Sequence, residues 1–419
     1  MPSSFIIREH VVEAQHIREY PHATAHSQED VLHLAVKQYI PKNNQNPAPG
    51  DITIIAAHAN GFVKEIYEPL WEDLISSLCH RGIKVRGIWI ADVAWQGQSG
   101  IINEANLGND PSWLDHARDL LYLTNHFRAS MPRPLIGIGH SFGANILVNL
   151  SLLHPRLLST VILLDPVLAR FQYMTNFSLE NALIPMFMSA NRRDLWPSRA
   201  AAIASFRRNP FFTSLDPRVF DTLITHGLRA VTGAAPRKGG APEEPVTLTT
   251  TKHMESFTYF RATFPASTPI PDADPDIRAS RQDYTFYRPE ATQTPDRLPH
   301  LRPGALYIFG AESPVNPPEA RREKLDLTGV GTGGSGGAAA GRVETVTLDG
   351  HGHLVPLEAT GRCAELAAGF IARDLEHWRR EQREFDEVWK VKDGGEKKTA
   401  SEEWKRVLGE AVKGVKEKL

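Results

Sequence analysis

Pro134-Leu135-Ile136-Gly137-Ile138-Gly139-His140-Ser141-Phe142-Gly143 is the stretch that decides the fold of this 419-residue chain. An apolar run typical of a strand leads directly into Gly-x-Ser-x-Gly, and residues 144–153 have helical character. A serine on a tight turn between a strand and a helix is typical of a nucleophile elbow, although the same turn could use the serine only as a helix cap. Ser141 is therefore a candidate nucleophile. The amide of Phe142, at the start of the helix, is a candidate donor to a developing oxyanion.

Predicted strands and helices alternate on both sides of this stretch. Because the inner strands are apolar on both faces, we expect an α/β fold with a mostly parallel central sheet flanked by helices. The predicted strands lie at 31–40, 52–57, 85–90, 134–138 and 160–164, and the predicted helices at 65–80, 113–128 and 144–153.

The alternation stops at about Pro166 and resumes with predicted strands at 305–310 and 343–348. We therefore expect a helical cap inserted between strands six and seven. The predicted division of the chain is a core of residues 1–165 and 300–380, a cap of residues 166–299, and a charged, helical C-terminal tail of residues 381–419.

Composition excludes several classes of function. Hydrophobic residues make up 41% of the chain and the net charge is −2, with no long run of Lys or Arg, so a nucleic-acid partner is not expected. Cys79 and Cys363 lie far apart and have no metal-ligand spacing, which favours an intracellular, reducing compartment and no metal or cofactor. We expect neither a signal peptide nor a membrane-spanning segment, because no apolar run approaches roughly 18 residues.

A serine hydroxyl needs a base to become a good nucleophile, and the position of the last predicted strand indicates which histidine supplies it. The segment Asp349-Gly350-His351-Gly352-His353 follows that strand directly. Loops that follow parallel strands meet at the same sheet edge, so a histidine here lies near the elbow. We predict His353 as the base and expect His351 to be a surface residue.

Four motifs in this order resemble the α/β-hydrolase fold family over residues 30–165 and 300–375. They are His58-Ala59-Asn60-Gly61, the loop from Asp92 to Ser99, the elbow, and Gly352-His353 followed by Glu358. The resemblance implies a catalytic triad in the order Ser, acid, His. It also implies an oxyanion hole made by the backbone amides of Asn60 and Phe142.

The chain departs from the family at the triad acid. Where an aspartate usually follows strand seven, this chain has Ser313, in Gly310-Ala311-Glu312-Ser313. Some members of the family carry the acid after strand six, where this chain has Asp165. We predict Asp165 as the acid, with Glu312 as the second candidate; the alternative for Asp165 is a turn residue before Pro166.

Short segments are also similar to a fungal subgroup of these hydrolases that includes a peroxisomal lipase and proteins of toxin biosynthesis. In that subgroup a serine also replaces the strand-seven acid. The segments are residues 113–119, 164–166, 209–212 and 352–355. The chain ends in Glu417-Lys418-Leu419, of which the last two residues fit a peroxisomal import signal, so peroxisome and cytoplasm both stay open and a peroxisomal import receptor is a candidate partner.

These patterns favour a serine hydrolase that cleaves a carboxylic ester, a lipid or acyl ester, through an acyl-enzyme. Two alternatives stay open: a catalytically silent scaffold used for binding, and a cofactor-free lyase or isomerase of secondary metabolism. Apolar residues of the predicted cap are candidates for an acyl pocket or for simple core packing: Phe171, Tyr173, Met174, Phe177, Met186, Phe187 and Met188.

Overall fold

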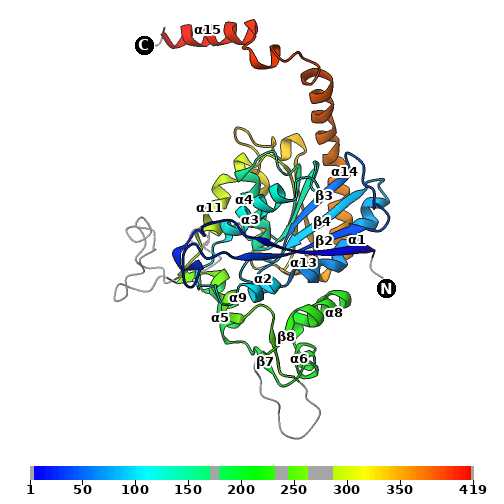
Figure 1. Ribbon diagram of the computed structural model, residues 1–419, viewed down its shortest axis with the longest axis vertical. Coiled ribbons are helices and arrows are strands. Elements are labelled where there is room, and N and C mark those ends of the chain that lie inside the picture. The colour runs from blue at the N-terminus through cyan, green and yellow to red at the C-terminus, as the bar shows by residue number, and fades with distance from the viewer. Residues whose placement is uncertain (1–3, 170–178, 232–243, 263–285, 417–419) are drawn as a thin grey trace. The chain divides into compact units, whose positions relative to one another are not determined.

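An eight-stranded sheet forms the centre of the computed structural model, which describes residues 4–169, 179–231, 244–262 and 286–416 (Figure 1). The strands inside it are almost entirely buried. In spatial order they are β1 (Phe5–Glu13), β2 (His33–Pro41), β4 (Val85–Ala91), β3 (Ile52–Ala57), β5 (Leu135–His140), β6 (Thr160–Leu164), β12 (Gly304–Gly310) and β13 (Val343–Leu348).

The sheet is mostly parallel, which confirms the predicted fold class. Only β1 with β2 and β2 with β4 pair antiparallel, and the other pairs run parallel. The sequence pattern does not predict β1. Within that edge strand only Phe5 and Val12 are buried, so the period-two alternation that signals a strand is missing.

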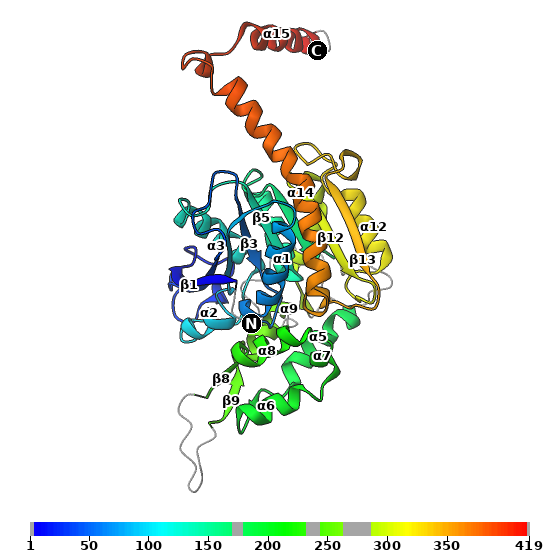
Figure 2. The same ribbon diagram turned by 90° about the vertical axis from the view of Figure 1, so that its right-hand side faces the viewer.

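Helices cover both faces of the sheet (Figure 1, Figure 2). One face carries α3 (Trp113–His126), α4 (Phe142–Leu153) and α11 (Pro289–Arg297). The other face carries α1 (Glu68–Cys79) and the first half of α14 (Thr360–Glu384). Shorter helices lie in the loops: α2 (Gly97–Ile102), α12 (Pro318–Leu327) and α13 (Val355–Glu358).

Two glycines allow the turn between β5 and α4 to form. A Cβ atom on Gly139 would lie 2.7 Å from the Cα atom of Ala144, and one on Gly143 would lie 2.4 Å from the carbonyl oxygen of Ala57. Both distances are too short for any side chain. The two glycines of Gly-x-Ser-x-Gly therefore let helix α4 pack directly against strands β5 and β3.

The segment between β6 and β12 is called here the inserted segment (residues 166–299). Most of its described part lies beyond the carboxyl ends of the parallel strands, whereas its last helix, α11, packs against α4 on one face of the sheet (Figure 2). Its first half is rich in helices, and a small three-stranded sheet ties it together. The elements are α5 (Leu179–Asn191), β7 (Leu195–Trp196), α6 (Arg199–Phe206), α7 (Pro210–Thr213), α8 (Pro217–His226), β8 (Leu228–Ala230), β9 (Val246–Leu248), α9 (Lys252–Tyr259), β10 (Arg261–Ala262), β11 (Phe286–Tyr287) and α11.

Residues 373–419 form a second unit of the chain. This unit holds the end of α14 and the helix α15 (Glu402–Lys416), which begins where Ser401 Oγ accepts a hydrogen bond from the Trp404 amide. None of the described helices is long and apolar enough to cross a bilayer. The terminal Glu417-Lys418-Leu419, on which the import-signal prediction depends, lies outside the described residues.

Candidate active site

Ser141 sits at the junction of β5 and α4 in a strained backbone conformation, with φ 58° and ψ −122°. Its amide donates a hydrogen bond to the Leu164 carbonyl, which ties the turn to the neighbouring strand. A positive φ in a residue other than glycine costs energy and persists only where the surrounding structure enforces it. The enforced turn places the Ser141 hydroxyl at the carboxyl edge of the sheet.

His353 lies within hydrogen-bond distance of both predicted partners. Its Nε2 atom is 2.8 Å from Ser141 Oγ, and its Nδ1 atom is 2.6 Å from Asp165 Oδ2. A carboxylate only accepts hydrogen bonds, so Nδ1 carries the proton and Nε2 is free to accept from the serine hydroxyl. The three residues come from loops after β13, β5 and β6, which meet at one edge because the strands are parallel.

Asp165 is fully buried and accepts hydrogen bonds from three groups. Besides His353, Ser313 Oγ donates to Oδ2 at 2.5 Å and the Gly310 amide donates to Oδ1 at 3.3 Å. Glu312, the second candidate, is exposed, and its amide donates to the His351 carbonyl. The structure thus brings Asp165 to His353 and leaves the Glu312 side chain at the surface.

Asn60 and Phe142, the predicted oxyanion donors, line the same cavity as Ser141. Among the residues that the structure describes, neither amide has a hydrogen-bond acceptor. The amides on either side of Asn60 are satisfied: Ala59 donates to Tyr67 Oη at 2.9 Å, and Gly61 donates to Gln96 Oε1 at 2.9 Å. This loop therefore keeps one donor available, and the first turn of α4 keeps another.

A buried relay connects this loop to the backbone of His353. The Ala59 amide donates to Tyr67 Oη, Tyr67 Oη donates to His140 Nδ1 at 2.8 Å, and His140 Nε2 donates to the His353 carbonyl at 2.9 Å. The relay needs a neutral imidazole that accepts at Nδ1. Burial supplies it, because desolvation lowers the pKa of His140 to about 3.

This lowered pKa predicts how stability depends on pH. In the unfolded chain His140 takes up a proton below about pH 6.5, whereas in the folded protein it stays neutral down to about pH 3. The free energy of unfolding therefore falls as pH drops through this window. In His140→Gln that contribution is absent, so between pH 6 and pH 4 its slope should be shallower than that of the wild type by about 1.4 kcal/mol per pH unit.

Urea unfolding at half-unit pH steps measures these slopes. The exposed His154 provides the matched control, and His154→Gln should keep the wild-type slope. Equal slopes for the wild type and His140→Gln would show that His140 is protonated in the folded protein too.

Residues of the His58 motif and of the Asp92–Ser99 motif form hydrogen bonds and ion pairs that fix these two loops. His58 accepts from the Val93 amide at Nε2 and donates to the Ala59 carbonyl at Nδ1, and burial lowers its pKa to about 4. Asp92 pairs with buried Lys64 at 2.6 Å. His351, predicted as a surface residue, is half-buried, and its Nδ1 atom lies 3.4 Å from Glu358 Oε2.

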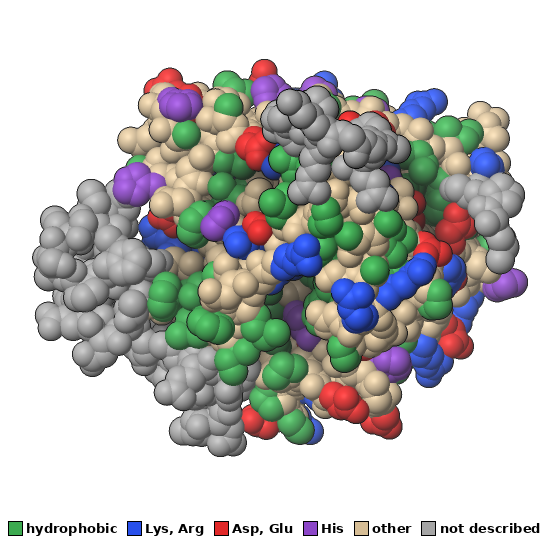
Figure 3. All heavy atoms as spheres, turned by 90° about the horizontal axis from the view of Figure 1, so that it is seen from below, with side chains coloured by type: hydrophobic (Ala, Val, Ile, Leu, Met, Phe, Trp, Pro, Cys, Tyr) green, Lys and Arg blue, Asp and Glu red, His purple; other side chains and the backbone are tan. Residues whose placement is uncertain are grey.

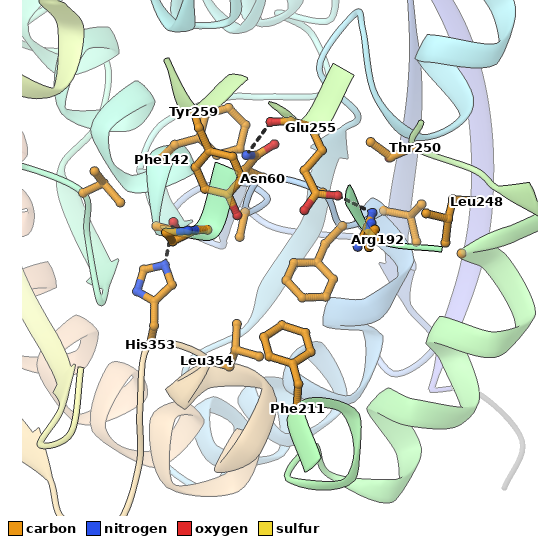
Figure 4. Close-up of a pocket in the computed structure, with 18 of the residues that line it drawn as sticks. Asn60, Phe142, Arg192, Phe211, Leu248, Thr250, Glu255, Tyr259, His353 and Leu354 are labelled. Atoms are coloured by element: carbon orange, nitrogen blue, oxygen red, sulfur yellow. Dashed lines mark hydrogen bonds and ion pairs between the residues drawn. The ribbon is translucent and has the colours of Figure 1, made fainter. Parts of the chain in front are cut away.

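Ser141 and His353 open into a cavity of about 310 Å³ whose wall is mostly apolar (Figure 4). Much of the wall comes from the inserted segment. The aromatic side chains of the wall include Phe62, Trp113, Phe206, Phe211 and Phe260. The described residues include no cluster of His, Cys, Asp or Glu side chains that could hold a metal ion.

The prediction of which residues line this cavity needs correction. Phe187 and Met188 are 68% and 65% exposed, and Met186 packs in a small cluster around Phe260. None of these three lines the cavity. The other four candidates lie outside the described residues: Phe171, Tyr173, Met174 and Phe177.

Sequence reasoning missed a polar group in this wall. Glu255 on α9 is buried, forms an ion pair with Arg192, and accepts from Ser189 Oγ at 2.6 Å (Figure 4). Burial raises the pKa of Glu255, while the arginine and the serine favour its charged form. The backbone carbonyl of Glu255 also accepts from Asn60 Nδ2 at 3.0 Å, so α9 contacts the loop that carries the free amide.

Comparison with known families finds one match over most of the chain. Residues 54–366 match the model of the alpha/beta hydrolase family. A crystal structure of the peroxisomal alpha-beta-hydrolase Lpx1 from Saccharomyces cerevisiae has a similar fold, with a TM-score of 0.68, 17% identity, and 99% of this chain and 98% of that chain covered.

Relatives in other fungi are more similar in sequence. "Type I acyl-CoA thioesterase mpaH'" of Penicillium brevicompactum is 40% identical and covers 99% of this chain and 98% of its own length. "Abhydrolase domain-containing protein AFT2-1" of Alternaria alternata is 25% identical and covers 66% of this chain and 98% of its own length.

Proposed function

Since this chain belongs to the alpha/beta hydrolase family, we propose that it is a serine hydrolase and that its substrate is an acyl-CoA thioester. The observation that carries the proposal is the unbroken series of hydrogen bonds from Ser141 Oγ through His353 to Asp165 at the edge of an apolar cavity. A relative that is 40% identical over nearly the whole chain is described as an acyl-CoA thioesterase, which favours a thioester over the oxygen ester predicted from the sequence.

In the first half of the proposed reaction, Ser141 Oγ attacks the thioester carbonyl and His353 Nε2 takes the hydroxyl proton. Asp165 stabilises the imidazolium that forms. The free amides of Asn60 and Phe142 donate to the carbonyl oxygen as it becomes negative. The carbon–sulfur bond then breaks, the thiol leaves with the proton from His353, and the acyl group remains on Ser141.

In the second half, water attacks the acyl-serine ester and gives a proton to His353. Collapse of the tetrahedral intermediate releases the carboxylic acid and returns that proton to Ser141. The same donors serve both halves. Net hydrolysis thus consumes one water and yields one free thiol and one acid.

The inserted segment acts in this proposal as the cap, with the core at residues 1–165 and 300–380. Its aromatic side chains supply much of the wall around Ser141. Apolar surface of this kind suits the acyl chain of a substrate, since burial of each methylene group stabilises binding by about 0.8 kcal/mol.

A substrate panel tests the proposal. Acyl-CoA thioesters and p-nitrophenyl esters of increasing chain length are compared by kcat/KM. We expect thioester hydrolysis with a preference for medium or long acyl chains. Hydrolysis of the oxygen esters alone would overturn the thioester assignment and restore the ester prediction. Turnover without release of both acid and thiol would favour the lyase or isomerase alternative.

The cellular compartment stays a prediction, with peroxisome and cytoplasm both open. Residues 399–419 fused to a fluorescent protein provide the test. Punctate fluorescence that overlaps a peroxisomal marker would support import by the peroxisomal receptor, and a diffuse signal would remove that prediction.

A further inference from the structure

We propose that Arg193, Arg207 and Arg208 form a basic rim that binds the phosphate groups of coenzyme A at the mouth of the cavity. The inference rests on the proposed thioesterase function. It concerns the binding of the nucleotide end of the substrate, which neither the catalytic residues nor the apolar wall explains.

Arg207 and Arg208 lie between two residues that line the cavity, Phe206 and Phe211. Local hydrogen bonds fix this short segment. The Arg207 amide donates to Ile203 O at 2.9 Å and the Phe211 amide donates to Asn209 Oδ1 at 3.0 Å. Both arginine side chains are exposed, and they directly follow Phe206 of the cavity wall in the sequence.

The same short segment is tied to the core next to the candidate active site. The ring of Phe211 stacks on Phe62, with centroids 6.5 Å apart and planes 7° from parallel. Phe62 follows Asn60 and Gly61 in the loop that carries the free amide. This contact fixes the backbone segment that carries the two arginines relative to the loop of Asn60.

Arg193 adds a third cation from another element. It follows Arg192, which lines the cavity, and its Nε atom donates to the Leu195 carbonyl at 2.8 Å. Its guanidinium lies 5.6 Å from the centre of the Trp196 ring. These contacts orient the side chain without neutralising its charge.

None of these three arginines forms an ion pair within the described residues, whereas several other exposed arginines do. Arg322, for example, pairs with Asp326 at 2.8 Å. The charged neighbours of Arg193 are already paired with each other: Arg192 with Glu255, and Lys252 with Asp194 at 3.4 Å. Within the part of the chain that the structure describes, no acidic side chain therefore pairs with the three positive charges of the rim.

One face of the molecule combines basic and apolar side chains around a hollow. In Figure 3 a hollow has basic side chains along one side and hydrophobic side chains along the other. The whole chain carries a net charge of −2, so this cluster does not reflect a generally basic protein. A local positive field at a mouth raises the rate at which anionic substrates arrive.

Coenzyme A matches this division of the surface. Its diphosphate and 3′-phosphate lie at the far end of a long pantetheine arm from the thioester. The acyl chain would occupy the apolar cavity, and the arm would lead the phosphates out to the rim. Arginine suits this role because its planar fork of donors matches phosphate oxygens.

The test compares two thioesters that share an acyl group. Decanoyl-CoA carries the phosphates, and decanoyl-N-acetylcysteamine keeps the thioester but lacks them. The measured quantity is the ratio of kcat/KM for the first substrate to kcat/KM for the second. We expect the double variant Arg207→Glu/Arg208→Glu to lower this ratio at least tenfold, mainly through a higher KM for decanoyl-CoA. Arg193→Glu should lower it further.

Arg156→Glu is the matched control, because Arg156 is exposed in the loop between α4 and β6, at the opposite edge of the sheet. It should keep the wild-type ratio. An unchanged ratio in the double variant, with both substrates hydrolysed, would contradict phosphate binding by the rim and leave the proposed function intact. If wild-type protein hydrolyses neither thioester, the proposed function itself fails.

Discussion

Ser141→Ala is expected to reduce kcat for thioester hydrolysis by about 10⁴ to 10⁶, as in serine hydrolases that lose the nucleophile. The substitution removes the only atom that the proposal allows to form the acyl-enzyme. His353 and the two free amides remain, so substrate should still bind with a similar dissociation constant. Initial rates with an acyl-CoA and binding of the same substrate to the variant measure the two effects separately.

Ser151→Ala provides the matched control for this substitution. Ser151 is a buried serine of α4, the helix that follows Ser141, and its hydroxyl donates to the Leu147 carbonyl at 2.9 Å, away from the cavity. Its removal should leave kcat within about twofold of the wild type. If Ser141→Ala retained a large part of the activity, another group would have to carry the chemistry. If folded wild type showed no turnover of any ester or thioester, the silent-scaffold alternative would gain support.

Asp165→Asn should lower kcat by about 10⁴, the loss found when the aspartate of a serine protease triad becomes asparagine. An asparagine side chain has nearly the same shape but carries no charge to stabilise the imidazolium. It can also donate to Nδ1, which would place the imidazole proton on Nε2 and stop that atom accepting from Ser141. The predicted loss is therefore in kcat, with little change in the free energy of unfolding.

Glu312→Gln is the control that separates the two candidate acids. Glu312 is exposed, and its charge should not affect His353, so near-wild-type turnover is expected. The opposite pattern, with Glu312→Gln inactive and Asp165→Asn active, would assign the acid to Glu312. Thermal unfolding of each variant shows whether a loss of rate reflects a loss of folded protein.

Much of the fold follows from local patterns. The elbow, the inner strands and the loop of His353 are continuous segments, and the residue pattern within each segment predicts its structure. Parallel strands share one carboxyl edge, so the approach of His353 to Ser141 could be expected without coordinates. The edge strand β1 could not, because its exposed apolar and charged residues resemble a loop and only pairing with β2 makes it a strand.

The surroundings of the acid depend on contacts between distant segments. Ser313 stands where an aspartate is usual, and its hydroxyl donates to Asp165, 148 residues earlier in the chain. No local pattern indicates that contact. The cavity wall also depends on contacts between distant segments. The predicted Met186, Phe187 and Met188 do not line it, whereas Phe206, Phe211 and Phe212 do, and Phe211 on α7 stacks on Phe62 of a distant loop.

Labelling with a fluorophosphonate tests whether Ser141 is the nucleophile, because the reagent reacts covalently with an activated serine. We expect one label per chain, located on Ser141 by peptide mass spectrometry, with thioesterase activity lost in proportion to labelling. Neither Ser141→Ala nor His353→Ala should react at a comparable rate. Thioester hydrolysis that persists in fully labelled protein, or a label on a different residue that accompanies the loss of activity, would contradict the account.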